Sequence, residues 1–151
     1  MIGARFVHVN LVAQDWRRLA EFYERAFGCQ RVPPERKLSG GWLEKGTGVT
    51  GAEIAGVHLR LPGYGEEGPT LEIFQYGQQR PAQEPAADRP GFGHIAFAVD
   101  DVEAARDAVI GAGGRAVGEV VSAEIPGAST IAFVYVTDPE GNIIELQHWS
   151  E

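Results

Sequence analysis

The sequence predicts an α+β fold in which two tandem βαβββ modules form a curved, mainly antiparallel eight-stranded sheet, with helices on its convex side. Two observations lead to this prediction. Residues 5–13 alternate between apolar and polar positions, and residues 15–27 then repeat apolar positions at helical spacing. Adding 86 to a residue number in the first half carries the same pattern into the second half. The matched positions are His8 with His94, Asp15 with Asp101, and Gly28 with Gly114.

The first module is expected to span residues 1–76. In its first strand Val7, Val9 and Leu11 share one face, and His8 and Asn10 share the other. Asp15 is placed to cap the helix that follows, and Gly28 is placed to end it. Further strands are predicted from short runs separated by glycine-rich breaks, at residues 30–32, 42–45, 57–61 and 71–76.

Residues 77–91 are polar and contain three prolines, which favours a linker within a single domain of residues 1–151. The second module, residues 92–151, starts with a strand at 92–99 and a helix at 101–112. Asp100 and Glu103 have the spacing of a capping box at the start of that helix. The remaining predicted strands are residues 115–121, 131–137 and 143–149, the last two joined by a turn at 138–142.

Composition excludes several classes of function. The net charge of −8, without any basic run, argues against a nucleic-acid partner. No apolar stretch is long enough to span a membrane and no signal peptide is recognisable, so we expect a cytoplasmic protein without a membrane partner. The single cysteine, Cys29, excludes an intrachain disulfide and a zinc site built from cysteines.

Four residues recur in two matched pairs and form the candidate metal site. Each half has a histidine in its first strand and a glutamate in its last, namely His8 with Glu72 and His94 with Glu145. The apolar neighbours of each residue point to the opposite face, so all four are expected on the face away from the helices. A carboxylate in the middle of a strand is costly unless it is paired or binds a cation. Two imidazoles and two carboxylates suit one divalent ion of Zn, Ni, Mn, Fe or Co.

These motifs resemble the vicinal oxygen chelate superfamily, which includes glyoxalase I, methylmalonyl-CoA epimerase, extradiol dioxygenases and drug-resistance proteins. The resemblance rests on FVHV at 6–9, TLEIF at 70–74, GHIAF at 93–97 and DPEGN at 138–142. It implies a protein, often a homodimer, that cups a metal ion able to bind vicinal oxygens of a small substrate. The ligand set is closest to that of glyoxalase I, although Val12 and Tyr76 replace the Arg and Asn that bacterial enzymes of that family use to hold glutathione.

The resemblance implies a metal-dependent lyase, isomerase or epimerase. The substrate would lose the proton next to a carbonyl to Glu145 or Glu72, through an enediolate stabilised by the metal. One alternative is an extradiol Fe(II) dioxygenase, because His8, His94 and Glu145 alone make a triad of two histidines and one carboxylate. The other alternative is a resistance-type binding protein that sequesters a drug.

Further residues are candidates for the same site. Glu44 falls where the epimerase family has an additional catalytic acid, but it is equally compatible with an exposed carboxylate in a hairpin. His58 and Arg60 share the polar face of the strand before Glu72, and Arg60 is suited to bind an anionic group of the substrate. We expect Asn10, His58 and Arg60 to bind substrate.

Overall fold

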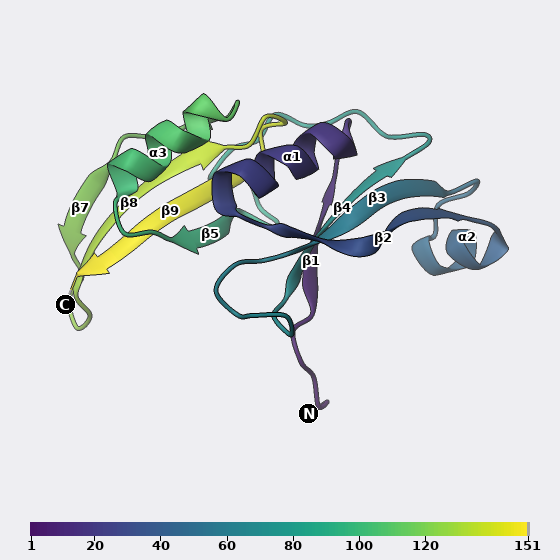
Figure 1. Ribbon diagram of the computed structural model, residues 1–151, viewed down its shortest axis with the longest axis horizontal. Coiled ribbons are helices and arrows are strands. Elements are labelled where there is room, and N and C mark those ends of the chain that lie inside the picture. Colours follow the sequence, from purple (N-terminus) through teal and green to yellow (C-terminus); the bar gives the residue numbers. More distant parts are fainter. Residues whose placement is uncertain (151) are drawn as a thin grey trace. The chain divides into compact units, whose positions relative to one another are not determined.

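The computed structural model describes residues 1–150, which divide into two compact units. The first unit is Met1–Pro81 and the second begins at Ala82, so the boundary falls inside the stretch predicted as a linker. The strands form two mixed sheets, one in each unit, and three helices accompany them (Figure 1). No helix within residues 1–150 is long and apolar enough to cross a membrane.

The first unit is a βαβββ module with one additional short helix. Its sheet has the strand order β1-β4-β3-β2, with β1 and β4 parallel and the other pairs antiparallel. The elements in chain order are β1 (His8–Val12), α1 (Trp16–Phe27), β2 (Gln30–Ser39), α2 (Gly41–Thr47), β3 (Glu53–Arg60) and β4 (Thr70–Tyr76).

Helix α1 begins and ends where the sequence predicts. The Asp15 carboxylate accepts a hydrogen bond from the Arg18 backbone N–H at 3.1 Å, which satisfies one of the free amides of the first turn. At the other end Gly28 adopts φ +67°, a left-handed conformation that a residue without Cβ tolerates. The helix therefore presents one continuous apolar side, with Leu19 and Tyr23 fully buried.

The sheet of the first unit separates an apolar face from a polar one. Val57 and Leu59 on β3 and Leu71 and Ile73 on β4 are at most 1% exposed, and α1 packs against these two strands. The alternate side chains point to the other face, and several of them, including His58 on β3 and Glu72 on β4, remain partly exposed. The predicted alternation is thus confirmed, and it places the histidines and glutamates on the side away from α1.

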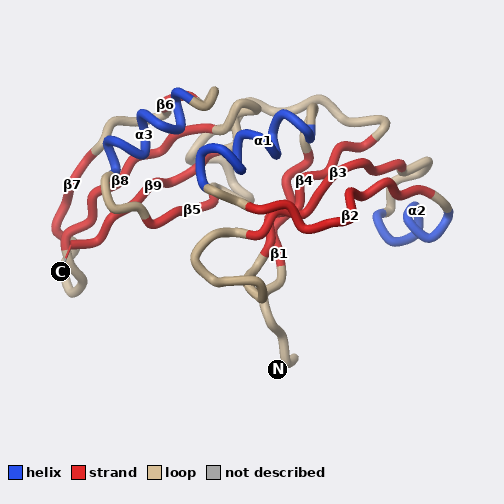
Figure 2. The backbone as a smooth tube through the Cα atoms, in the orientation of Figure 1, coloured by secondary structure: helices blue, strands red, loops and turns tan. Residues whose placement is uncertain are grey.

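The prediction of a strand at residues 42–45 is wrong. These residues form helix α2, which lies beyond the end of β2 (Figure 2). Its Leu43 is buried against Ile54 and packs with Leu38, Phe74 and Tyr76. A run as short as WLEK at 42–45 does not by itself distinguish a strand from a helical turn, and this contact with distant residues decides in favour of the helix.

The second unit repeats the module. Its sheet has the order β5-β9-β8-β6, with β7 also paired to β8, and β5 and β9 are parallel. Helix α3 packs against β8 and β9, whose Val134, Val136, Ile144 and Leu146 are fully buried. The elements are β5 (Ile95–Ala98), α3 (Val102–Gly111), β6 (Arg115–Ala116), β7 (Val121–Glu124), β8 (Thr130–Thr137) and β9 (Ile143–Ser150).

Two details of the second unit differ from the prediction. Of the strand expected at 115–121, only β6 (Arg115–Ala116) and the first residue of β7 (Val121–Glu124) are strand, because the backbone N–H groups of Val117 and Gly118 both donate to the Tyr135 carbonyl and interrupt the ladder like a bulge. Residues 1–150 consequently contain nine strands, in sheets of four and five, instead of eight in one sheet. The cap of α3 is Asp101, which accepts from the Ala104 N–H at 3.0 Å, so Asp100 is not the capping residue.

The turn before β9 is held by one aspartate, as its sequence indicates. The Asp138 carboxylate accepts hydrogen bonds from the backbone N–H groups of Glu140 and Asn142 and from the Asn142 side chain, at 2.9, 3.0 and 2.7 Å. Asp138 is fully buried, so these hydrogen bonds offset the desolvation of its charge. The turn fixes the start of the strand that carries Glu145.

Candidate functional site

The register of the first sheet brings residues from three strands together on its polar face. Asn10 on β1 lies opposite Glu72 on β4, and Glu72 lies opposite His58 on β3. His8, two residues before Asn10, lies opposite Thr70. Because directly opposed residues point to the same side of a sheet, all five side chains share one face.

Glu72 is the centre of this cluster. Its Oε2 is 2.9 Å from His58 Nε2, and its Oε1 accepts a hydrogen bond from Asn10 Nδ2 at 3.2 Å. His8 Nε2 lies 3.4 Å from the same Oε1. The Glu72 side chain is only 12% exposed, so these partners replace much of the water that would otherwise solvate its charge.

Burial shapes the electrostatics of His58. It lowers the pKa of the imidazole below the ordinary value of 6.5, because the charged form loses hydration. The Glu72 carboxylate raises this pKa, whereas the electrostatic interactions with Arg36, His8 and Arg60 lower it further. The net direction is downward, which favours a neutral His58 near pH 7.

The second unit holds a similar pair. His94 immediately precedes β5, and its Nε2 is 2.9 Å from Oε2 of Glu145 on β9. Glu145 is 15% exposed and lies between Ala96 of β5 and Tyr135 of β8 in the sheet. The ring centroids of Tyr135 and His94 are 4.9 Å apart. The paired arrangement expected from the internal duplication is therefore present in each unit.

Tyr135 and Thr70 are neighbours of the site that sequence reasoning missed. Tyr135 occupies in the second sheet the position that His58 occupies in the first, directly across from the glutamate. The alternation of buried Val134 and Val136 around Tyr135 is the signal that could have placed it on the polar face. Thr70 is a cross-strand partner of Arg60 and His8, and pairing of this kind is not visible without the register.

The donor chemistry of the two pairs fits a divalent transition metal. Each pair offers an imidazole nitrogen and a carboxylate oxygen within 3.4 Å of each other, and the two glutamate side chains are only 12% and 15% exposed. No group of three or more His, Cys, Asp or Glu side chains within residues 1–150 is arranged to hold a metal ion. Each unit by itself therefore presents a pair of candidate ligands, not a complete coordination sphere.

The Glu44 carboxylate forms a hydrogen bond with the loop that follows its helix. It lies on α2, and its Oε1 accepts a hydrogen bond from the Gly51 backbone N–H. This contact closes the segment that leads from α2 to β3. Within the described residues Glu44 makes no hydrogen bond or ion pair with His8, His58 or Glu72, and its bond to Gly51 supports a structural role for this carboxylate.

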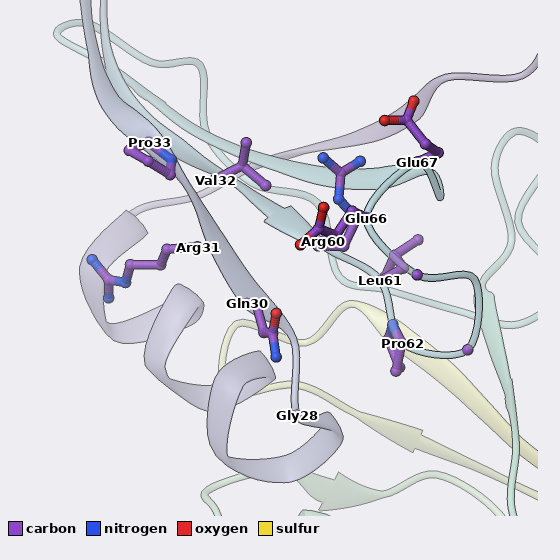
Figure 3. Close-up of a pocket in the computed structure, with 12 residues that line it drawn as sticks. Gly28, Gln30, Arg31, Val32, Pro33, Arg60, Leu61, Pro62, Glu66 and Glu67 are labelled. Carbon is purple, nitrogen blue, oxygen red and sulfur yellow. The ribbon is translucent and has the colours of Figure 1, made fainter.

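Arg60 lines a cavity of about 700 Å³ where β2 starts and β3 ends (Figure 3). Its Nη1 donates to the Gly68 carbonyl, which ties the β3–β4 loop to the strand. Arg31 also lines this cavity, but its guanidinium points toward α1, where it binds Glu24 at 2.8 and 3.0 Å. The side chains of Gln30, Val32, Leu61, Glu66 and Glu67 complete much of the wall.

The βαβββ topology occurs twice, and each sheet has a pair of imidazole and carboxylate side chains on its polar face. These features define a class of two-module proteins. A family model described as the Glyoxalase/Bleomycin resistance protein/Dioxygenase superfamily matches residues 5–146. The chain belongs to this superfamily.

Individual relatives agree with that assignment. A probable lactoylglutathione lyase from Vibrio parahaemolyticus serotype O3:K6 is 30% identical over 150 residues, covering 97% of this chain and 91% of the relative. The crystal structure of a glyoxalase family protein from Bacillus cereus matches with a TM-score of 0.75 at 18% identity, covering 100% of this chain and 96% of the other. The fosfomycin resistance protein FosX from Listeria monocytogenes, complexed with Mn(II) and sulfate, matches with a TM-score of 0.56 at 13% identity, covering 99% and 95%.

Proposed function

We propose that this protein is a divalent-metal-dependent lyase or isomerase of the glyoxalase type, which removes a proton next to a carbonyl group of a small substrate. The observation that carries the proposal is the pairing of His8 with Glu72 and of His94 with Glu145, at 3.4 and 2.9 Å. The similarity to a probable lactoylglutathione lyase supports the reaction class, and the Mn(II) complex of a structural relative supports the kind of ion.

His8, Glu72, His94 and Glu145 are the proposed ligands. A divalent ion held by them would act as a Lewis acid that polarises the substrate carbonyl and makes the neighbouring proton more acidic. Neutral imidazoles and ionised carboxylates are the forms that bind such an ion. The lowered exposure of both glutamates strengthens their electrostatic interaction with a cation relative to exposed carboxylates.

Glu145 is the carboxylate that we assign to proton transfer. Glu72 has hydrogen-bond partners on both oxygens, whereas the partner of Glu145 within residues 1–150 is His94, on Oε2. A carboxylate with an uncommitted oxygen is better able to accept the proton and return it. Glu44 is retained only as a second candidate acid, because its Oε1 already accepts from Gly51.

Arg60 is proposed to bind an anionic group of the substrate in the cavity at the end of β3. It lies two residues from His58 on the same face of the strand, so a bound anion would be close to the Glu72 cluster. Val12 and Tyr76 replace the glutathione-binding residues of bacterial glyoxalase I, which favours a substrate other than a glutathione adduct.

Metal content tests the ligand assignment. After dialysis against metal-free buffer and reloading, we expect wild type to hold one transition metal per site, Glu72→Ala to lose it, and Glu119→Ala to retain it as an exposed-carboxylate control. If wild type takes up no metal, the proposal is wrong, and a drug-sequestering binding protein becomes the function to test.

Proton exchange tests the reaction. Loss of the α-proton signal in D₂O should be followed by NMR for 2-oxo acids, acyl-CoA thioesters and hemithioacetals. We expect Glu145→Gln to slow exchange of an active substrate by roughly 10²–10⁴-fold, the usual contribution of a general base. A Glu145→Gln variant that keeps its metal and exchanges at the wild-type rate would remove Glu145 from the catalytic role.

A further inference from the structure

His58 makes a close contact with Glu72, and the proposed set of metal ligands does not account for this contact. The two residues are directly opposed on β3 and β4, and His58 Nε2 is 2.9 Å from Glu72 Oε2. This is the shortest contact of the Glu72 carboxylate, shorter than those to Asn10 at 3.2 Å and His8 at 3.4 Å. A contact of this length between an imidazole N–H and a carboxylate is a charge-assisted hydrogen bond.

An ionised carboxylate only accepts hydrogen bonds, and the other ring nitrogen of His58 has a partner that is compatible with donation from Nε2. Nδ1 lies 3.5 Å from the hydroxyl oxygen of Thr70, a residue that is 7% exposed. When the Thr70 hydroxyl donates to Nδ1, the proton of the neutral ring is on Nε2, which then donates to Glu72. The chain Thr70 to His58 to Glu72 is the arrangement in which an outer residue orients a carboxylate ligand.

Packing holds the His58 ring in this orientation. The ring is in edge-to-face contact with Phe74 and with His8, at centroid distances of 5.8 and 5.9 Å. His58 is 18% exposed, less than His8 at 41%. The ring therefore has aromatic neighbours as well as hydrogen-bond partners, and rotating it would break contacts of both kinds.

The two oxygens of Glu72 consequently face different partners. Oε2 is committed to His58, and Oε1 is on the side of Asn10 and His8. In the second unit Tyr135 occupies the position of His58, yet no hydrogen bond joins it to Glu145 in the described part of the chain. Among residues 1–150 the orienting contact is therefore found in the first module alone.

From this geometry we infer that His58 is a positioning residue, whose Nε2–H fixes Oε2 of Glu72 so that Oε1 remains directed toward His8. The inference rests on the proposed function in one respect, since it takes Glu72 to be a metal ligand. It replaces the substrate-binding role that the sequence suggested for His58, because both ring nitrogens already have partners within the protein.

The contact itself is tested on metal-free protein, independently of any activity. Long-range ¹H–¹⁵N correlation spectra should show His58 protonated on Nε2. Glu72→Gln should shift the His58 Nε2 resonance and leave that of His148, which contacts the Val99 carbonyl, unchanged. A His58 resonance that does not respond to Glu72→Gln would overturn the inference.

The consequence is tested by Co²⁺ titration of wild type, His58→Leu, His58→Gln and the control His148→Gln. We expect His58→Leu to weaken Co²⁺ binding by about 10–100-fold, as is usual for loss of an outer hydrogen bond, and to leave the visible absorption bands in place. His58→Gln, which keeps an N–H donor, should recover much of the affinity, and His148→Gln should match wild type.

The outcomes distinguish failure of the positioning role of His58 from failure of the proposed metal-dependent function. Wild-type affinity in His58→Leu would overturn the positioning role, and a changed band pattern would overturn it in favour of His58 as a ligand. If wild type binds no Co²⁺, the proposed function fails, and the NMR response to Glu72→Gln alone then supports or overturns the His58 contact.

Discussion

Gly56 lies where β3 passes close to β4, two residues before His58. A Cβ built on Gly56 would collide with the Ile73 carbonyl oxygen and would lie 2.7 Å from Phe74 Cδ1. Because one of these atoms belongs to the backbone of a central strand, the clash cannot be relieved by a side-chain rotation. Gly56 is thus required by the close approach of two strands, not by a turn.

We expect Gly56→Ala to lower the free energy of unfolding by about 1–3 kcal/mol, the usual cost of overpacking, and to reduce the urea midpoint. Gly46→Ala is the matched control. Gly46 lies in α2 with no atom near its added Cβ, so alanine there should be neutral or stabilising by up to about 1 kcal/mol. Equal stabilities for the two variants would contradict the close approach of β3 and β4 at Gly56.

Cys29 follows the end of α1 and is 4% exposed. Burial raises the pKa of its thiol to about 11, and the nearby Glu24 carboxylate acts in the same direction. The thiol is therefore protonated at neutral pH and shielded from reagents. We expect a disulfide reagent at pH 8 to modify native protein much more slowly than urea-unfolded protein; comparable rates would show that the site opens readily.

The raised pKa of Cys29 also predicts how the stability of the protein changes with pH in the alkaline range. The unfolded thiol loses its proton near its ordinary pKa of 9.0, below the folded pKa of about 11. Between these values the folded state binds more protons, so this contribution to stability is complete below pH 9 and declines as the pH rises. Urea unfolding from pH 8 to 11 should show a steeper decline for wild type than for Cys29→Ala.

At the scale of single elements, the helix caps distinguish sequence spacing from actual geometry. Asp100 and Glu103 have the spacing of a capping box, but the backbone places Asp101 at the cap of α3, in the same role as Asp15 at α1. A shift of one residue is within the uncertainty of any helix start read from sequence. The correspondence of Asp15 with Asp101 in the duplication was the more reliable guide.

We expect Asp101→Ala to destabilise the protein by about 1 kcal/mol, because the Ala104 N–H loses its acceptor. Asp100→Ala should cost less than about 0.5 kcal/mol, as for an ordinary surface position. Urea denaturation of both variants beside wild type measures the difference. A larger effect for Asp100→Ala would contradict this assignment and support the predicted capping box of Asp100 and Glu103.

The elements that were predicted correctly have strong local patterns. Helices α1 and α3 and strands β1, β4, β8 and β9 each combine a clear apolar period with a cap or turn residue at one end. Helix α2 and the division between β6 and β7 have no such signal. Leu43 becomes buried against Ile54, and Gly118 shares the Tyr135 carbonyl with Val117, through contacts between residues far apart in the chain.

At the scale of the whole molecule, the segment between the two units should be the most accessible to proteolysis. Most of residues 77–91 are exposed and lie outside helices and strands. Arg80, Glu84 and Arg89 each precede a proline, so enzymes specific for basic or acidic residues should cut poorly there. A protease of broad specificity suits the experiment better.

We expect brief digestion with proteinase K to make its first internal cut within residues 77–91, giving two fragments that mass spectrometry assigns to the two modules. The exposed loop between β3 and β4 is the internal comparison, because Arg60 and the Leu61 N–H bind its far end at the carbonyls of Gly68 and Pro69. An earlier cut in that loop would contradict the prediction.

The sequence by itself determined the module, its repetition and the two His–Glu pairs, because each depends on local periodicity and on a register that recurs along the chain. Only the tertiary structure decided which residues surround each glutamate. The contacts of His58 and Asn10 with Glu72, and the position of Tyr135 beside His94, follow from strand pairing. Hydrogen bonds between strands join residues distant in sequence, and no local pattern specifies which of them become neighbours.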